Sequence, residues 1–144
     1  METLTIDPKT ADLNEMIERG TNLHGHLGPF LVAGIRMGLL ALKLLDSPGY
    51  FGIRAISEAG KVTPLSCLTD GVQIGSGCTT GKGNLSVTDA RRPRVHFETD
   101  DGRKVVITLR PEALEDFRSG ELIAESHRTA VRPLEELFTW EVLS

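Results

Sequence analysis

The longest apolar run in the chain, Pro29 to Leu45, reads PFLVAGIRMGLLALKLL and is hydrophobic nearly all the way round a helix. Its 17 residues stand at the short limit of a membrane span, and Arg36 lies near its middle. Because a central arginine costs about 2.5–3.5 kcal/mol on insertion scales, the run predicts a buried helix of a soluble protein. Gly34 and Gly38 stand four residues apart, a spacing that lets two helix backbones approach closely. We expect this helix to lie at a subunit interface too, and hence a dimer.

The hydrophobic pattern predicts two further elements of helix and one of strand in the first half of the chain. One helix is expected from Ala11 to about Arg19, followed by Gly20 as its stop, and another from Pro64 to about Ile74. The residues Tyr50 to Ser57 read as a strand. The apolar residues of that strand expected to be buried are Phe51, Ile53 and Ile56.

Alternating apolar and polar residues after Leu85 predict strands, the last two of which form a hairpin. A two-residue turn at its tip would place Phe97 opposite Val106, and the apolar face would be split. A three-residue loop, Asp100 to Gly102, keeps that face together, with Gly102 in the left-handed conformation of a bulge. The pairs that this register places on the apolar face are Val95 with Ile107 and Phe97 with Val105.

After Pro111 the pattern predicts helix again, in two pieces split near Gly120. Helices, then strands, then helices describe an α+β fold, with an antiparallel sheet whose hairpin covers residues 94–110. We expect residues 1–144 to form one such domain, because no repeat or linker interrupts them. The apolar residues at the end of the last helical segment are Leu134, Leu137, Phe138, Trp140 and Val142.

Composition and charge exclude some classes of protein but do not indicate a particular function. The chain has 144 residues, 40% hydrophobic and 25% charged, which is typical of a globular protein. A formal net charge of −4 gives no reason to expect a nucleic-acid partner. The opening METLTIDPKTADLN is acidic and polar, unlike a signal peptide, so we expect a cytoplasmic protein whose two cysteines are free thiols.

Four residues are candidate ligands of a soft metal: His24, His26, Cys67 and Cys78. There is no Cys-x-x-Cys pair, and a helix from Pro64 to Ile74 would put Cys67 roughly 10 Å from its end, so no disulfide is expected. The favoured site is the histidine pair with one cysteine and an open position. The alternative is that the histidines bond backbone groups at the start of the apolar helix while the cysteine is an inert, buried side chain.

The glycine-rich loop Ser76 to Asn84 reads SGCTTGKGN and is not a Walker motif, because Gly83 stands where a serine or threonine is needed. Its backbone N–H groups and Lys82 could still hold an anion, and a purely structural loop is the equal alternative. On the preceding helix Cys67, Asp70 and Gln73 share one face at i, i+3 and i+6, which could line a binding site or form an exposed edge. His96 and His127 are expected to face solvent.

Two segments, NLHGHLGPFLVAGIRMG and CLTDGVQIGSGCTTGKGNL, resemble the two signature motifs of the family named for FmdE, the E subunit of formylmethanofuran dehydrogenase. The resemblance covers roughly Asn22 to Leu85, with order and spacing intact. It implies an α+β core that forms an intertwined dimer, here without the C-terminal zinc finger of some members. The chain departs from the family pattern at Gly28, where cysteine is usual, and at Phe30, where glycine is usual.

Carried over residue by residue, the resemblance implies site residues in both segments. The histidines correspond to His24 and His26, and the helix residues to Cys67, Asp70 and Gln73. The loop residues correspond to Cys78, Thr79, Gly81, Lys82 and Asn84. Because Gly28 stands where the family usually has a cysteine, the chain lacks the residue that could carry out redox or covalent chemistry at the start of the apolar helix.

Three functions compete on this basis. The first is a dimeric protein that binds a divalent metal, with zinc favoured over iron or nickel, and is accessory to the subunits of a redox metalloenzyme. The second is an enzyme with Cys67 or Cys78 as nucleophile and Asp70 as a further catalytic candidate. The third is a module that holds a small anionic cofactor at the glycine-rich loop. Neither nucleic acid nor a membrane is expected as a partner. The residues expected to contact such an anion are Gln73, Thr79, Gly81, Lys82 and Asn84.

Overall fold

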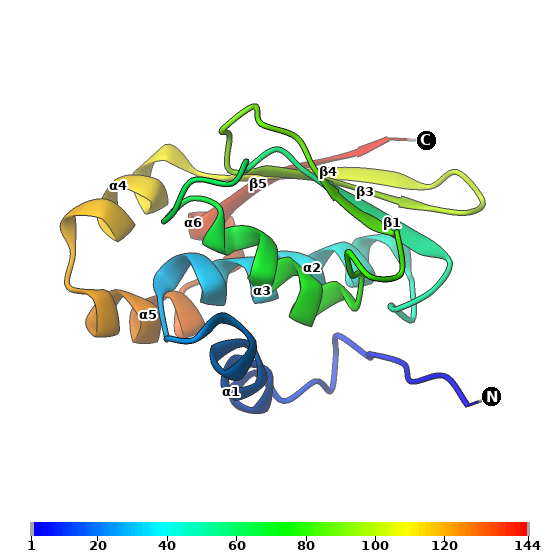
Figure 1. Cartoon of the computed structure of the whole chain (residues 1–144), viewed down its shortest axis with the longest axis horizontal. Coiled ribbons are helices and arrows are strands. Elements are labelled where there is room, and N and C mark those ends of the chain that lie inside the picture. The colour runs from blue at the N-terminus through cyan, green and yellow to red at the C-terminus, as the bar shows by residue number, and fades with distance from the viewer. Residues whose placement is uncertain (1, 144) are drawn as a thin grey trace.

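The computed structural model describes residues 2–143, and it has the α+β architecture that the sequence predicts. A five-stranded sheet forms one layer, and α2 and α3 lie against one of its faces (Figure 1). Helix α1 packs on the other side of α2 and α3, away from the sheet. The helices are α1 (Leu13–His24), α2 (Pro29–Leu45), α3 (Cys67–Ser76), α4 (Pro111–Ser119), α5 (Leu122–Val131) and α6 (Leu134–Leu137).

The sheet is mixed, with the strand order β2-β1-β3-β4-β5. The pairings of β1 with β3, β3 with β4 and β4 with β5 are antiparallel, as expected. The pairing of β1 with β2 is parallel, which corrects the expectation of a wholly antiparallel sheet. The reason is that α3 connects these two strands as a crossover and returns the chain to the end where β1 began. The strands are β1 (Ile53–Ser57), β2 (Leu85–Val87), β3 (Arg94–Thr99), β4 (Lys104–Leu109) and β5 (Phe138–Leu143).

Helix α2 has the bounds that the sequence predicts, and most of its residues are buried between the sheet and the other helices. Arg36, the charge near its middle, donates hydrogen bonds to the carbonyl oxygens of Thr129 and Arg132. These carbonyls lie at the C-terminal end of α5, where helix carbonyls lack partners within the helix. The arginine therefore ties α2 to α5. No helix among residues 2–143 is long and apolar enough to cross a membrane.

The hairpin between β3 and β4 has the predicted register. Val95 pairs with Ile107 and Phe97 with Val105, and all four side chains face the core. Gly102 has a φ of 90°, the left-handed conformation required at this position of a three-residue loop.

Two predicted helix boundaries were wrong. Helix α1 continues through Gly20 to His24, because Gly20 lets the helix pack closely on the side chains of Ile35 and Leu31. Helix α3 begins at Cys67 rather than Pro64. The residues before it form a turn in which the N–H of Ser66 donates to the carbonyl of Val62 and the N–H of Cys67 to the carbonyl of Pro64.

The C-terminal segment also differs from its prediction. A break at Gly120 separates α4 from α5, as expected, but Phe138 to Leu143 forms strand β5 and not the end of a helix. Its β-branched and aromatic residues pair with the free edge of β4, with Trp140 opposite Ile107. Of the three residues expected to be buried in the first strand, only Ile53 is buried. Phe51 precedes the strand and Ile56 lies on its outer face, so both are exposed.

Candidate metal centre

Helices α2 and α3 run parallel, and their N-termini lie at the same end of the helical layer. Two pairs of glycines set their separation: Gly34 meets Gly71, and Gly38 meets Gly75. A Cβ atom at Gly34 would stand 2.9 Å from the Cα of Gly71, and one at Gly38 would stand 2.7 Å from the carbonyl carbon of Gly75. Backbone therefore touches backbone. This close contact fixes Cys67, the first residue of α3, beside the segment that leads into α2.

His24, the last residue of α1, is oriented by a carboxylate. The chain turns at Gly25, whose φ of 99° closes the helix, and continues through His26 into α2. The Nδ1 atom of His24 lies 2.6 Å from Oδ2 of Asp70 on α3, and the His24 side chain is only 11% exposed. The imidazole N–H donates to this carboxylate, which places the remaining lone pair on Nε2.

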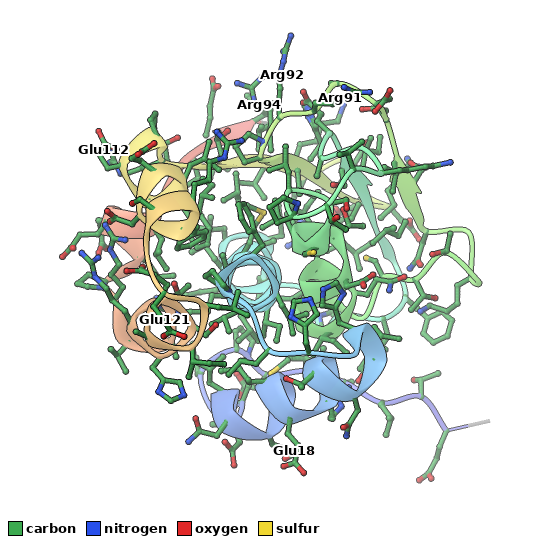
Figure 2. All side chains as sticks on the ribbon, turned by 60° about the vertical axis from the view of Figure 1, so that its left-hand side comes forward. Glu18, Arg91, Arg92, Arg94, Glu112 and Glu121 are labelled. Carbon is green, nitrogen blue, oxygen red and sulfur yellow. The ribbon has the colours of Figure 1, made fainter. Side chains whose placement is uncertain are left out.

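His26 and Cys67 complete a cluster of three donors. One candidate ligand atom from each of His24, His26 and Cys67 lies within 4.8 Å of the other two. The two imidazole rings are 4.7 Å apart between centroids and tilted by 49°. Figure 2 shows side chains filling the space between α1 and α3. Nδ1 of His26 lies 3.0 Å from the carbonyl oxygen of Leu27, and as a donor there it leaves Nε2 free as well. Cys67 is buried and His26 is exposed, so the cluster reaches the surface on the histidine side.

One atom of this cluster lacks a partner that a buried polar atom normally has. Nε2 of His24 is buried and accepts no hydrogen bond within the described structure. A carboxylate on one ring nitrogen and a free lone pair on the other is the arrangement of a histidine that binds a metal, because the carboxylate fixes the tautomer and raises the basicity of the ligand. Two imidazoles and a thiol are donors that zinc, iron and nickel accept. The residues present therefore fit a divalent metal ion.

The environment of Cys67 argues against a free thiolate. Burial raises the pKa of the Cys67 thiol, and the negative charge of Asp70 raises it further. The position of Cys67 at the start of α3 acts in the opposite direction, since a helix N-terminus stabilises a thiolate. The two raising effects prevail. A cation beside the sulfur would reverse them, because a coordinated thiol is deprotonated outright.

Cys78, the other predicted cysteine ligand, is not part of this cluster. It lies at the far end of α3, is fully buried in the hydrophobic core, and its Sγ is 3.7 Å from the carbonyl oxygen of Ile53. Burial raises the pKa of this thiol as well. Both cysteines are free, as expected. Of the three catalytic candidates, the structure brings Cys67 and Asp70 to the histidines and places Cys78 elsewhere.

The polar residues of the glycine-rich loop bind one another. Oδ1 of Asn84 accepts from the N–H of Thr79, and its amide donates to the carbonyls of Tyr50 and Ile53. Nζ of Lys82 donates to the carbonyl of Gly77 at 2.6 Å and to the hydroxyl of Thr79. These bonds hold the loop against the start of β1, which favours the structural alternative for it.

Of the remaining two anion-contact candidates, Gln73 bonds within the loop and Gly81 does not. Oε1 of Gln73 accepts from the N–H and hydroxyl of Thr80, so this side chain also closes the loop. Gly81 is exposed, with no atom within 4 Å of where a Cβ would stand. His127 is exposed, as predicted, whereas His96 is half-buried and paired with Glu58 on the outer face of the sheet.

The comparison with protein families identifies the chain's relatives. The model of the family described as FmdE, molybdenum formylmethanofuran dehydrogenase operon, matches residues 23–144. The chain belongs to the FmdE family. The match begins within the segment that carries His24 and His26 and continues through the C-terminal strand, so it extends well beyond the two motifs that suggested the family.

One curated protein resembles this FmdE chain in sequence, and one solved structure resembles it in fold. A curated protein of Archaeoglobus fulgidus, described as a probable S-adenosyl-L-methionine-binding protein, is 30% identical over 127 residues. These are 83% of this chain but 33% of the relative, so the FmdE chain spans about a third of that protein's length. A crystal structure of an FmdE-like protein of tungsten formylmethanofuran dehydrogenase type, from Syntrophus aciditrophicus, matches with a TM-score of 0.67 at 22% identity. It covers 99% of this chain and 77% of that one, and shares the fold.

Sequence reasoning missed the partners of the glycine pair in α2. Gly71 and Gly75 stand four residues apart, as Gly34 and Gly38 do, and this matched spacing was the available signal. It also missed Leu122 at the start of α5, whose Cδ1 would lie 3.8 Å from a Cβ at Gly28. No pattern along the FmdE sequence pointed to that contact.

Proposed function

We propose that this FmdE chain binds one divalent metal ion, with zinc the best match, through His24, His26 and Cys67. The observation that carries the proposal is the buried, unpartnered Nε2 of His24 within a cluster of three donors. Asp70 acts as a positioning residue that holds the His24 ring. The bound ion would supply a positive charge that keeps Cys67 as thiolate and a Lewis-acid centre open to solvent at His26.

The test is metal uptake by protein purified without an affinity tag. Elemental analysis and competition with a chromophoric chelator should give one zinc per chain, lost in His24→Ala and in Cys67→Ala. His127→Ala and Cys78→Ala are matched controls, because they remove an exposed imidazole and a core thiol away from the cluster. A metal-free protein that also ignores added Zn²⁺ would overturn the proposal, as would equal losses in the controls.

We propose further that the chain acts as an accessory protein to the subunits of a redox metalloenzyme, as a cytoplasmic homodimer. Membership of a family named for a dehydrogenase operon supports the first part, and two free cysteines support a reducing compartment. Co-purification with dehydrogenase subunits and light scattering of the purified chain test the partner and the dimer separately. A chain that stays monomeric at all concentrations refutes the dimer alone.

The alternatives have less support. A cysteine nucleophile needs a depressed pKa, whereas burial raises the pKa of both thiols. If either cysteine were alkylated faster than a peptide thiol at neutral pH, that result would support the cysteine-nucleophile hypothesis. An anion at the glycine-rich loop would have to displace the hydrogen bonds that Lys82 makes within the loop. The likeness to the Archaeoglobus protein adds S-adenosyl-L-methionine to the ligands that a binding assay should include.

A further inference from the structure

The cluster of His24, His26 and Cys67 provides three donors, whereas zinc bound through imidazole and thiolate is usually four-coordinate. Among residues 2–143, no fourth histidine, cysteine, aspartate or glutamate has a ligand atom in this group. Asp70 contacts the cluster, but its Oδ2 is already bonded to Nδ1 of His24. The fourth position is therefore available to a group from outside the described chain.

The space beside Gly28 could accommodate such a group. A Cβ at Gly28 would lie 3.4 Å from Cε1 of His26, 3.7 Å from its Nδ1 and 3.8 Å from Cδ1 of Leu122, all ordinary contact distances. Gly28 has an extended backbone with φ of −158°, so its lack of a side chain is not required by its conformation. Space for a carbon atom thus lies next to the ring of a candidate ligand, with an aliphatic side chain on its other side.

The surroundings favour an anion with an aliphatic stem. Helices α2 and α3 both begin at this end of the molecule, and no side-chain hydrogen bond caps either N-terminus. Two parallel helix dipoles therefore present their positive ends to the cluster. Leu122 is about half exposed at the start of α5 and would contact an apolar stem. Soft and borderline donors such as thiolate and imidazole select metals that also accept a further soft ligand.

From these observations we propose that the metal site is open at Gly28 and binds a small aliphatic thiolate as its fourth ligand. The inference rests on the proposed function and specifies the ligand class of that same site. On binding, the thiol releases its proton to solvent, and a sulfur lone pair fills the open position; no electron is transferred. His26, the exposed member of the cluster, lies on the entry side.

The experiment uses the full chain loaded with Co²⁺ in a buffer with a phosphine reductant and no thiol. Sulfur ligands of Co²⁺ give charge-transfer absorption, which counts thiolates without any activity assay. Titration with 2-mercaptoethanol should raise this absorption to a plateau in the wild type, and acetate should not. In Gly28→Cys the absorption should be higher before any probe is added, and the response to 2-mercaptoethanol should be lost.

Gly81→Cys is the matched control, because it adds a cysteine at an exposed position with nothing within 4 Å of its Cβ, on the loop beyond the opposite end of α3. It should respond as the wild type does. A cobalt-loaded wild type that ignores the probe, or a Gly28→Cys variant that responds like the wild type, overturns the inference while metal binding stands. A spectrum that changes with protein concentration instead assigns the fourth ligand to a second copy and also overturns it. Failure to take up Co²⁺ or Zn²⁺ at all refutes the proposed function itself.

Discussion

Replacing Gly71 by alanine tests whether the backbone contact between α2 and α3 stabilises the fold. A Cβ at this position would overlap the carbonyl oxygen of Leu31, its nearest neighbour, and would lie 2.8 Å from both the Cα of Gly34 and the amide nitrogen of Ile35. Because favourable contacts between carbon atoms lie near 3.5–4.0 Å, the helices would have to separate by roughly 0.7 Å or more. The neighbouring atoms are backbone, so no side chain can rotate away to make room.

The expected net effect is a loss of about 2 kcal/mol in the free energy of unfolding. Overpacking costs about 1–3 kcal/mol, and rigid neighbours put this site at the upper end. Alanine returns about 0.5–1 kcal/mol through its better helix propensity. For a chain of this size the melting temperature should fall by about 4–8 °C, measured by circular dichroism or calorimetry. Gly81→Ala, with open space around its Cβ, should stay within about 0.5 kcal/mol of the wild type. A Gly71→Ala protein as stable as the wild type would refute the argument.

Single contacts give three further predictions. Asp70→Asn removes the charge that orients His24 and should weaken zinc binding by about 10–100-fold in chelator competition, with the fold intact; unchanged affinity contradicts the role of Asp70. In the metal-free protein the folded state holds the thiol protons more tightly than the unfolded state, since burial raises the pKa of Cys67 and Cys78. Stability present below pH 9.0 should therefore be lost as the pH rises through the raised pKa values, and Cys78→Ala should flatten this loss in thermal melts. Lys82→Met should lower stability by about 1 kcal/mol through its lost bond to Gly77 and leave phosphate binding unchanged in calorimetry.

Local chemistry was enough to predict some elements and not others. The hairpin register followed from keeping Val95, Phe97 and their partners on one face, and a glycine at its tip is needed in any such loop. The bounds of α2 followed from an apolar run with a proline at its start. Strand β5 was missed because its formation depends on the free edge of β4, a partner that stands about 30 residues earlier in the chain. In the structure Trp140 pairs with Ile107. The apolar residues from Leu134 to Val142 are too few to tell a helical spacing from a strand spacing.

In the candidate site, too, some features could be predicted from the sequence and others could not. Cys67 and the two histidines were singled out by residue type and by the resemblance to FmdE proteins, and the structure brings them together. Cys78 was added by the same criteria and lies in the core instead. The sequence already predicted that the two cysteines lie apart, but not which of them joins the histidines. That depends on the parallel packing of α3 on α2, which brings the first residue of α3 to the start of α2. This packing could not be deduced from spacing, because it depends on contacts between segments about 40 residues apart.

The dependence of the cluster on the packing of α2 and α3 has a consequence for folding. His24 ends α1, His26 leads into α2 and Cys67 begins α3, so a metal ion bound to all three would join α3 to two helices that lie far from it along the chain. Binding to the folded state alone adds about 2.7 kcal/mol when the free ion is at 100 times its dissociation constant. This exceeds the loss of about 2 kcal/mol expected for Gly71→Ala. Zinc at that excess should therefore restore the melting temperature of Gly71→Ala to at least that of the metal-free wild type. Zinc that stabilises the wild type but leaves the melting temperature of Gly71→Ala unchanged would contradict this expectation, and would mean that the variant no longer binds the ion.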